Sequence, residues 1–165
     1  MDHTLFNHIT TFIFDVDGVF TNSEVIVFEN GDHVRVMNTR DGQALKIAME
    51  SGYNVAVITK GFSVGVRKRF EFLGVPYIYD RLLEKTEAFQ EFKTLLGLKK
   101  ENILFMGDDI PDLVLYSEVG ISATPADGAI ENLQRAIYIS PKKGGQGCVR
   151  DVIEKVLRIQ GKWNF

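Results

Sequence analysis

Short apolar segments alternate with longer amphipathic segments along most of this chain of 165 residues. The apolar segments, such as TFIF at 11–14 and the β-branched run at 53–58, have hardly any polar face, which is typical of strands covered on both sides. The amphipathic segments, such as 63–73 and 148–160, have the spacing of surface helices. Strands that alternate with helices predict a parallel sheet with helices on both faces.

The pattern predicts a single α/β domain over residues 1–165, a three-layer α/β/α Rossmann-like fold of about six parallel strands. Asn30-Gly31 lies between two short β-prone segments, 24–28 and 34–37, and this combination predicts a protruding β-hairpin. The strands are expected at 11–14, 53–58, 75–79, 102–106, 120–123 and 137–139. The helices are expected at 41–51, 63–73, 84–96, 111–119, 127–135 and 148–160, with Asp41 as a possible N-cap of the first.

The charge balance and the cysteine content limit the kinds of partner that the protein can bind and the cellular compartment in which it can function. Nineteen basic residues against 22 acidic ones leave a formal net charge of −3, so neither nucleic acid nor an anionic membrane surface is expected as a partner. Cys148 is the only cysteine, which excludes an internal disulfide and a CxxC metal site. No apolar run reaches the roughly 18 residues of a membrane span, and residues 1–11 lack the pattern of a signal peptide. A cytoplasmic location is therefore expected.

Acidic residues follow two of the predicted strands. Asp15 and Asp17 come after the first strand, and Asp108 and Asp109 follow the strand at 102–106, with Asp112 close behind. A single Asp at such a place is commonly a cap or a turn residue. Because the carboxyl ends of parallel strands share one edge, where ligands bind in open α/β sheets, we expect these acids to form one site. Crowded carboxylates need a cation, and all-oxygen ligation favours Mg²⁺.

The same edge supplies the groups for phosphoryl transfer. Asp15 could attack a phosphoryl group to form an aspartyl-phosphate, and Asp17, two residues on, could transfer the proton. Thr59, which ends the second core strand, and Lys85, at the start of a helix, could hold a phosphate. Taken alone, Thr59 is typical of a residue that ends a strand, and Lys85 is typical of a side chain exposed to solvent. A role in phosphate binding is favoured only because both residues are predicted to lie near the acidic residues.

The four segments together resemble the motifs of haloacid dehalogenase superfamily phosphatases. The matching residues are Phe14-Asp15-Val16-Asp17-Gly18-Val19, Ile58-Thr59, Lys85 and Gly107-Asp108-Asp109-Ile110-Pro111-Asp112. The resemblance implies that Asp15 is the nucleophile and a Mg²⁺ ligand, that Asp17 is the acid/base and binds Mg²⁺ through its backbone carbonyl, and that Asp108 completes the ligand set. It also implies phosphate binding by Thr59 and Lys85, with Asp109 and Asp112 supporting the ligands.

A closer resemblance, over about residues 10–160, is to the 3-deoxy-manno-octulosonate 8-phosphate phosphatases of that superfamily. It rests on residues 15–21, on the hairpin, on Asn38-Thr39-Arg40-Asp41-Gly42 and on Gly144-Gly145-Gln146-Gly147. It implies a small sugar phosphate as the substrate, with Asn38, Arg40, Asp41, Gly42 and Arg69 lining the sugar pocket. The same domain resembles phosphatases of nine-carbon sialic-type sugar phosphates and the C-terminal domains of some acylneuraminate cytidylyltransferases, so these alternatives stay open.

The chain departs from the superfamily pattern after the second core strand, where Thr59-Lys60-Gly61 stands in place of Thr-Gly-Arg. The spacing between motifs leaves no room for a cap domain, so the resemblance implies a homotetramer built on the 24–37 hairpin, with Gly144 to Gly147 near an adjoining active site. A non-enzymatic phospho-switch like a response-regulator receiver is the alternative from another class, but receivers carry the acceptor Asp on the third strand rather than the first.

Overall fold

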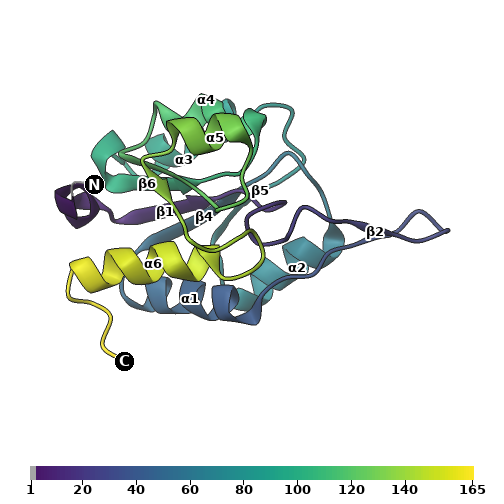
Figure 1. The fold of residues 1–165 in the computed structure, drawn as a ribbon, viewed down its shortest axis with the longest axis horizontal. Helices are drawn as coiled ribbons and strands as arrows, with labels where there is room; N and C mark the ends of the chain where they lie inside the picture. The colour runs from purple at the N-terminus through teal and green to yellow at the C-terminus, as the bar shows by residue number, and fades with distance from the viewer. Residues whose placement is uncertain (1–2) are drawn as a thin grey trace.

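The computed structural model describes residues 3–165, and the first two residues of the expected domain lie outside this range. Six parallel strands form the central sheet, as the alternation predicts (Figure 1). They are β1 (Thr11–Phe14), β4 (Asn54–Ile58), β5 (Tyr77–Tyr79), β6 (Ile103–Met106), β7 (Ile121–Thr124) and β8 (Tyr138–Ile139). Each lies within a few residues of its expected position.

The order of the strands in the sheet is β5-β4-β1-β6-β7-β8. Without the hairpin strands, this is the order 3-2-1-4-5-6 of the doubly wound dinucleotide-binding folds, which confirms the Rossmann-like prediction. The chain runs outward from β1 to one side through β4 and to the other side through β6. The carboxyl ends of β1 and β6 therefore meet at the point where the connections diverge, and ligands of such sheets bind at this point.

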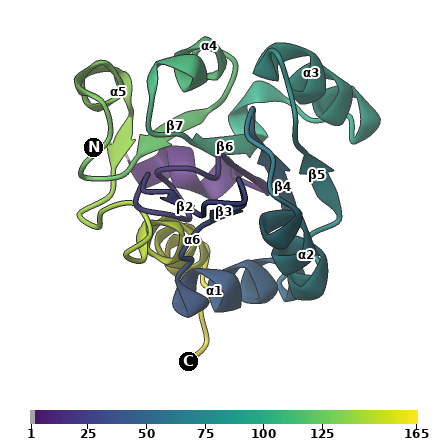
Figure 2. The ribbon, with the colours of Figure 1, turned by 90° about the vertical axis from the view of Figure 1, so that its right-hand side faces the viewer.

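Helices cover both faces of the sheet (Figure 2). One layer contains α1 (Thr39–Glu50), α2 (Val64–Leu73) and α6 (Cys148–Ile159), and the other contains α3 (Lys85–Leu95), α4 (Leu113–Tyr116) and α5 (Ile130–Arg135). Ser63 caps α2, and Gly74 ends it in the left-handed conformation. Within residues 3–165, no helix has the length and apolar character that crossing a membrane requires.

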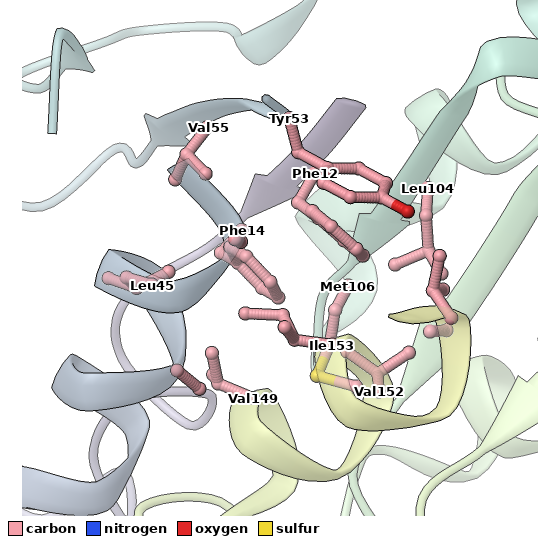
Figure 3. Close-up of a cluster of buried hydrophobic side chains, with 14 of the residues drawn as sticks. Phe12, Phe14, Leu45, Tyr53, Val55, Leu104, Met106, Val149, Val152 and Ile153 are labelled. Carbon is pink, nitrogen blue, oxygen red and sulfur yellow. The ribbon is translucent and has the colours of Figure 1, made fainter. Parts of the chain in front are cut away.

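Alternate residues of each central strand pack into different cores. Phe12 and Phe14 of β1 face the core beneath α1 and α6, whereas Ile13 faces the core beneath α3. In the larger core, the two phenylalanines belong to one buried cluster with Leu45 of α1 and Val149 of α6 (Figure 3). Because β1 is fully buried on both faces, its backbone is a rigid support for the residues that follow it.

The predicted hairpin is present, but its strands are shorter than expected. β2 (Ile26–Val27) and β3 (His33–Val34) form an antiparallel pair outside the main sheet, whereas 24–28 and 34–37 were expected to be extended. All four paired residues are exposed, and the hairpin projects from the body of the molecule (Figure 1). A ribbon of two strands with no covering layer is marginally stable, which is why the ladder is so short.

Other boundaries also differ from the sequence prediction. Asn38 caps α1 by accepting a hydrogen bond from the Arg40 backbone N–H at 2.8 Å, so the N-cap expected at Asp41 is wrong by one turn. The helix expected at 111–119 is a 3-10 turn, η3 (Ile110–Asp112), followed by the single turn of α4. The 3-10 helices η1 (His3–His8) and η2 (Lys100–Asn102) were not predicted, because such short turns have no periodic apolar pattern.

Candidate active site

The first motif begins where β1 ends. Asp15 extends the ladder by donating its backbone N–H to the Met106 carbonyl of β6 at 3.0 Å, and its side chain is buried. The chain then turns at Gly18, whose φ of +82° favours glycine. A Cβ at this position would also overlap the carboxylate of Asp108. The first and fourth motifs are thus packed against each other, and this contact requires glycine at position 18.

The loop after β6 is organised around the carboxylate of Asp112. Its Oδ2 atom accepts the backbone N–H groups of Asp108 at 2.9 Å and Asp109 at 3.2 Å. Asp112 is 1% exposed, and a Cβ on Gly107 would overlap it. Asp109 itself is exposed and caps η3 through the backbone N–H of Ile110. The two residues expected to support the ligands therefore hold the shape of the loop that presents Asp108.

Lys85 joins the two motifs electrostatically. It begins α3, is 3% exposed, and places Nζ 2.7 Å from Asp15 Oδ1 while also pairing with Asp112 Oδ1. Burial by itself would lower the pKa of Lys85, but the two carboxylates together outweigh burial and raise it above its ordinary value. Lys85 is therefore a permanent positive charge inside the acidic cluster.

The carboxylates of the cluster repel one another. Asp15, Asp108 and Asp112 each offer an oxygen atom, and these atoms all lie within 4.8 Å of one another. Burial, and then the charges of Asp15 and Asp112, raise the pKa of Asp108 to about 8; burial also raises the pKa of Asp15, against the opposing charge of Lys85. A divalent cation would offset this repulsion, and one or two carboxylate oxygens from this cluster are the kind of ligand that Mg²⁺ takes from proteins. The residues present thus fit the expected metal.

A cavity of about 240 Å³ opens beside this cluster. The residues expected to act in catalysis, phosphate binding and metal binding all line it: Asp15, Asp17, Thr59, Lys85, Asp108, Asp109 and Asp112. Thr59 is 6% exposed, and its hydroxyl oxygen accepts the Gly61 N–H at 3.2 Å, which leaves the hydroxyl hydrogen for a ligand. Lys60 lies at the rim, with Nζ 3.3 Å from Glu84 Oε1.

Asp17 has a partner that sequence reasoning missed. Arg35, one residue beyond β3, binds its carboxylate with two hydrogen bonds, Nε to Oδ1 at 2.6 Å and Nη2 to Oδ2 at 3.1 Å. The nearest position to the missing motif arginine is Gly61, where a Cβ would lie 3.1 Å from Asp17 Oδ2. The guanidinium at this place comes instead from the hairpin. The only signal in the sequence is one basic residue between Val34 and Val36, which does not reveal its partner.

The comparisons with known proteins agree with this geometry. No protein-family model matches the chain. The 3-deoxy-D-manno-octulosonate 8-phosphate phosphatase of Escherichia coli K12 is 34% identical over 155 residues, which cover 94% of this chain and 82% of the relative. This chain belongs to that phosphatase family, within the haloacid dehalogenase superfamily.

Solved structures of the family superimpose closely on this one. The phosphatase from Yersinia pestis matches with a TM-score of 0.95 at 30% identity, over 97% of this chain and 86% of that one. The phosphatase from Moraxella catarrhalis, solved in complex with magnesium, phosphate and KDO, matches with a TM-score of 0.93 at 30% identity, over 98% and 92% of the two chains. The expected fold and the resemblance are both confirmed.

The residues implied for the sugar pocket lie elsewhere in the protomer, and none lines the 240 Å³ cavity. Asn38 and the exposed Arg40 border an open depression of about 610 Å³ beside α6. Arg69 borders a groove of about 820 Å³ between the hairpin and α2. A Cβ on the buried Gly42 would lie 2.9 Å from Arg69 Nη2. A role for these residues in this family member thus depends on surfaces outside the carboxylate cavity.

Asp41, which was expected to line the sugar pocket, lies instead between α1 and α6. It is fully buried, and its Oδ1 atom accepts the Arg150 backbone N–H at 2.8 Å. The first turn of α6 follows Gly147, which has no side chain to cap it, so Asp41 of α1 caps α6 across the helix pair. Burial, which disfavours the charged form, raises the pKa of Asp41 to about 6 even though the backbone hydrogen bonds and the charge of Arg150 oppose the shift. Its observed role is structural.

Proposed function

We propose that this protein is a Mg²⁺-dependent phosphomonoesterase that hydrolyses 3-deoxy-D-manno-octulosonate 8-phosphate to the free sugar and phosphate. The observation that carries the proposal is the buried cluster of Asp15, Lys85, Asp108 and Asp112 at the meeting point of β1 and β6. This cluster lies in a chain that matches the named phosphatases over 94% of its length, which favours that substrate over the other phosphate esters.

The reaction proceeds in two steps on the residues of the first motif. The carboxylate of Asp15 attacks phosphorus, the bond from phosphorus to the sugar oxygen breaks, and Asp17 gives the departing oxygen its proton. Water then attacks the phosphorus of the aspartyl-phosphate and transfers a proton to Asp17, which releases inorganic phosphate and restores both residues. The burial of Asp15 on a rigid strand end supports its role as the attacking group.

The remaining polar groups lower the repulsion between Asp15 and the incoming phosphate. Lys85 contributes a buried positive charge, and Thr59 contributes a hydroxyl donor. Asp15, Asp108 and the backbone carbonyl of Asp17 are the proposed Mg²⁺ ligands. When bound, the metal supplies positive charge that neutralises the phosphate oxygens. Asp109 and Asp112 keep the Asp108 loop in shape.

Recognition of the sugar is proposed to need neighbouring subunits. The proposed assembly is a homotetramer through the 24–37 hairpin, and it is supported by the exposed apolar residues there, among them Val27 at 63% and Val36 at 70% exposure. In such an assembly Asn38, Arg40, Asp41, Gly42 and Arg69 retain their proposed part in the sugar pocket, with Asp41 acting by holding α6. The cytoplasm is the proposed location.

A phosphate-release screen tests the proposal. Purified protein with Mg²⁺ is assayed on the eight-carbon keto-sugar acid phosphate, a nine-carbon sialic-type phosphate and simple hexose phosphates. We expect the highest kcat/KM on the eight-carbon ester. A higher value on the nine-carbon ester would reassign the substrate, and labelling of the protein without turnover would favour a phospho-switch.

A further inference from the structure

Arg35, one residue beyond β3 in the 24–37 hairpin, turns its side chain into the protein. Its neighbours Val34 and Val36 are 42% and 70% exposed, whereas the Arg35 side chain is 9% exposed. An arginine is rarely buried without a specific partner, because its charge is costly to desolvate. The hairpin therefore contributes one charged group to the interior, and that group lies beside the cavity that holds Asp15.

The guanidinium of Arg35 fixes both oxygens of Asp17. The two hydrogen bonds of 2.6 Å and 3.1 Å form a fork, which sets the orientation of the carboxylate as well as its distance. Asp17 keeps 37% of its side-chain exposure and borders the cavity. The carboxylate is thus held from one side by Arg35 and remains open to substrate on the other.

A second arginine, Arg67, also binds an aspartate through its guanidinium, but away from the carboxylate cavity, and it serves as a comparison for Arg35. Arg67 of α2 binds Asp80 with Nε to Oδ2 at 2.9 Å, and it also donates to the Ile78 carbonyl. Asp80, the carboxylate that Arg67 binds, does not border the cavity of Asp15, whereas Asp17, the carboxylate that Arg35 binds, does. Arg35, by contrast, leaves its buried Nη1 without a partner among residues 3–165, which is an uncommon cost for a group that serves stability alone.

We propose that Arg35 is a positioning residue for Asp17: by forking its carboxylate, Arg35 holds the acid/base group in line with the departing oxygen. The inference deepens the proposed phosphatase function and rests on it. It also makes the hairpin part of the active centre of its own protomer. Arg35 does not itself touch the reacting atoms, so its loss acts through the placement of Asp17.

The consequence is a changed sensitivity to the leaving group. When Asp15 forms its bond to phosphorus, the ester oxygen leaves with the bonding electrons and takes the proton of Asp17. A weakly basic aryl oxide leaves without that proton, whereas a strongly basic oxide depends on it. A misplaced Asp17 therefore slows esters of poor leaving groups selectively. The effect belongs in kcat/KM, which reports steps up to the loss of the first leaving group.

The experiment uses ring-substituted phenyl phosphates that differ in the basicity of the leaving group, with the full chain and saturating Mg²⁺. We expect Arg35→Met to change kcat/KM less than about threefold for the best leaving group and to lower it about 100-fold for the poorest. The leaving-group dependence of Arg35→Lys should lie between those of Arg35→Met and the unaltered protein, since lysine restores the charge but not the two parallel hydrogen bonds. Arg67→Met, the matched control, should keep the leaving-group dependence of the unaltered protein.

A double variant separates positioning from a general loss of structure. Asp17→Asn should show the same steep dependence, and adding Arg35→Met to it should steepen the dependence no further. An Arg35→Met protein that loses the same factor on every ester would overturn the inference while leaving the phosphatase proposal standing. If Arg35→Met does not fold, an unchanged slope in Arg35→Lys and Arg35→Gln overturns it equally. An unaltered protein that hydrolyses neither these esters nor the eight-carbon keto-sugar phosphate overturns the proposed function, and this inference with it.

Discussion

The sheet edge and the hairpin are held together in opposite ways. At the edge, Asp112 is 1% exposed and is bound by Lys85 and by two backbone N–H groups, so both of its carboxylate oxygens have partners. In the hairpin, both two-residue strands are exposed. Arg35 connects the hairpin to the rest of the protein through its hydrogen bonds to Asp17. The difference teaches that the acidic cluster stands on a rigid core, whereas the exposed hairpin is joined to that core through the side chain of Arg35.

The largest expected effect is at the edge. Asp15→Asn removes the attacking oxygen anion, so phosphate release should fall on the order of 10⁵-fold. The thermal midpoint should not fall, because one of the repelling carboxylates is gone. Asp32→Asn in the hairpin turn is the matched control and should keep full activity. Substantial turnover by Asp15→Asn would contradict the assignment of the nucleophile.

Removing divalent metal is the next largest perturbation. Treatment with EDTA should lower the rate on the order of 10³-fold, since the metal contributes several kcal/mol of charge stabilisation. Readdition of Mg²⁺ should restore the rate and raise the thermal midpoint of the unaltered protein but not of Asp108→Asn. Undiminished rates in exhaustively chelated protein would exclude the metal role.

Asp41 tests whether the charge of a carboxylate buried between α1 and α6 lowers the free energy of unfolding, as the crowded carboxylates do at the sheet edge. The pKa of Asp41 is raised to about 6, so the unfolded chain loses this proton at lower pH than the folded protein does. The free energy of unfolding of the unaltered protein, relative to Asp41→Asn, should therefore fall by up to about 3 kcal/mol between pH 4 and pH 7. Urea titrations of both proteins measure it, and a flat difference would show that Asp41 ionises normally.

Gly144 tests how tightly the first motif is supported. A Cβ there would overlap the Gly18 carbonyl, so Gly144→Ala should cost about 1–3 kcal/mol of stability and reduce activity. The control is Gly65→Ala in α2, where the nearest atom to the new Cβ is 3.8 Å away and alanine should stabilise the helix by about 1 kcal/mol. Equal denaturant midpoints for the two variants would argue against close packing at Gly144.

The smallest effect on the protomer is expected in the hairpin. Val27→Asp changes a side chain that is 63% exposed, so the free energy of unfolding of the protomer should shift by less than about 0.5 kcal/mol. The same change should dissociate the proposed tetramer, which light scattering would detect. A monomeric unaltered protein would remove the shared-interface part of the proposal.

The parts of the fold that were predictable depend on local patterns. β1 at Thr11–Phe14 was found from four consecutive apolar or β-branched residues, and the acids of the site were found because they follow strands. The contacts that were missed join residues distant in sequence. Arg35 binds an acid 18 residues earlier, and Asp41 caps a helix that begins more than 100 residues later. Such pairings are set by the packing of whole elements, and no periodicity in the chain encodes them.

Support of the first motif by the glycine-rich segment has a consequence for biosynthesis. Gly145 donates its N–H to the Val19 carbonyl at 2.9 Å, and the Cys148 thiol lies 3.1 Å from the same oxygen. The turn that carries Asp15 and Asp17 is therefore completed only by residues translated more than 120 positions later. A ribosome-bound chain that ends before the glycine-rich segment contains Asp15 but lacks the residues that pack behind its turn, so the native form of that turn is reached only after residues 144–148 have left the exit tunnel.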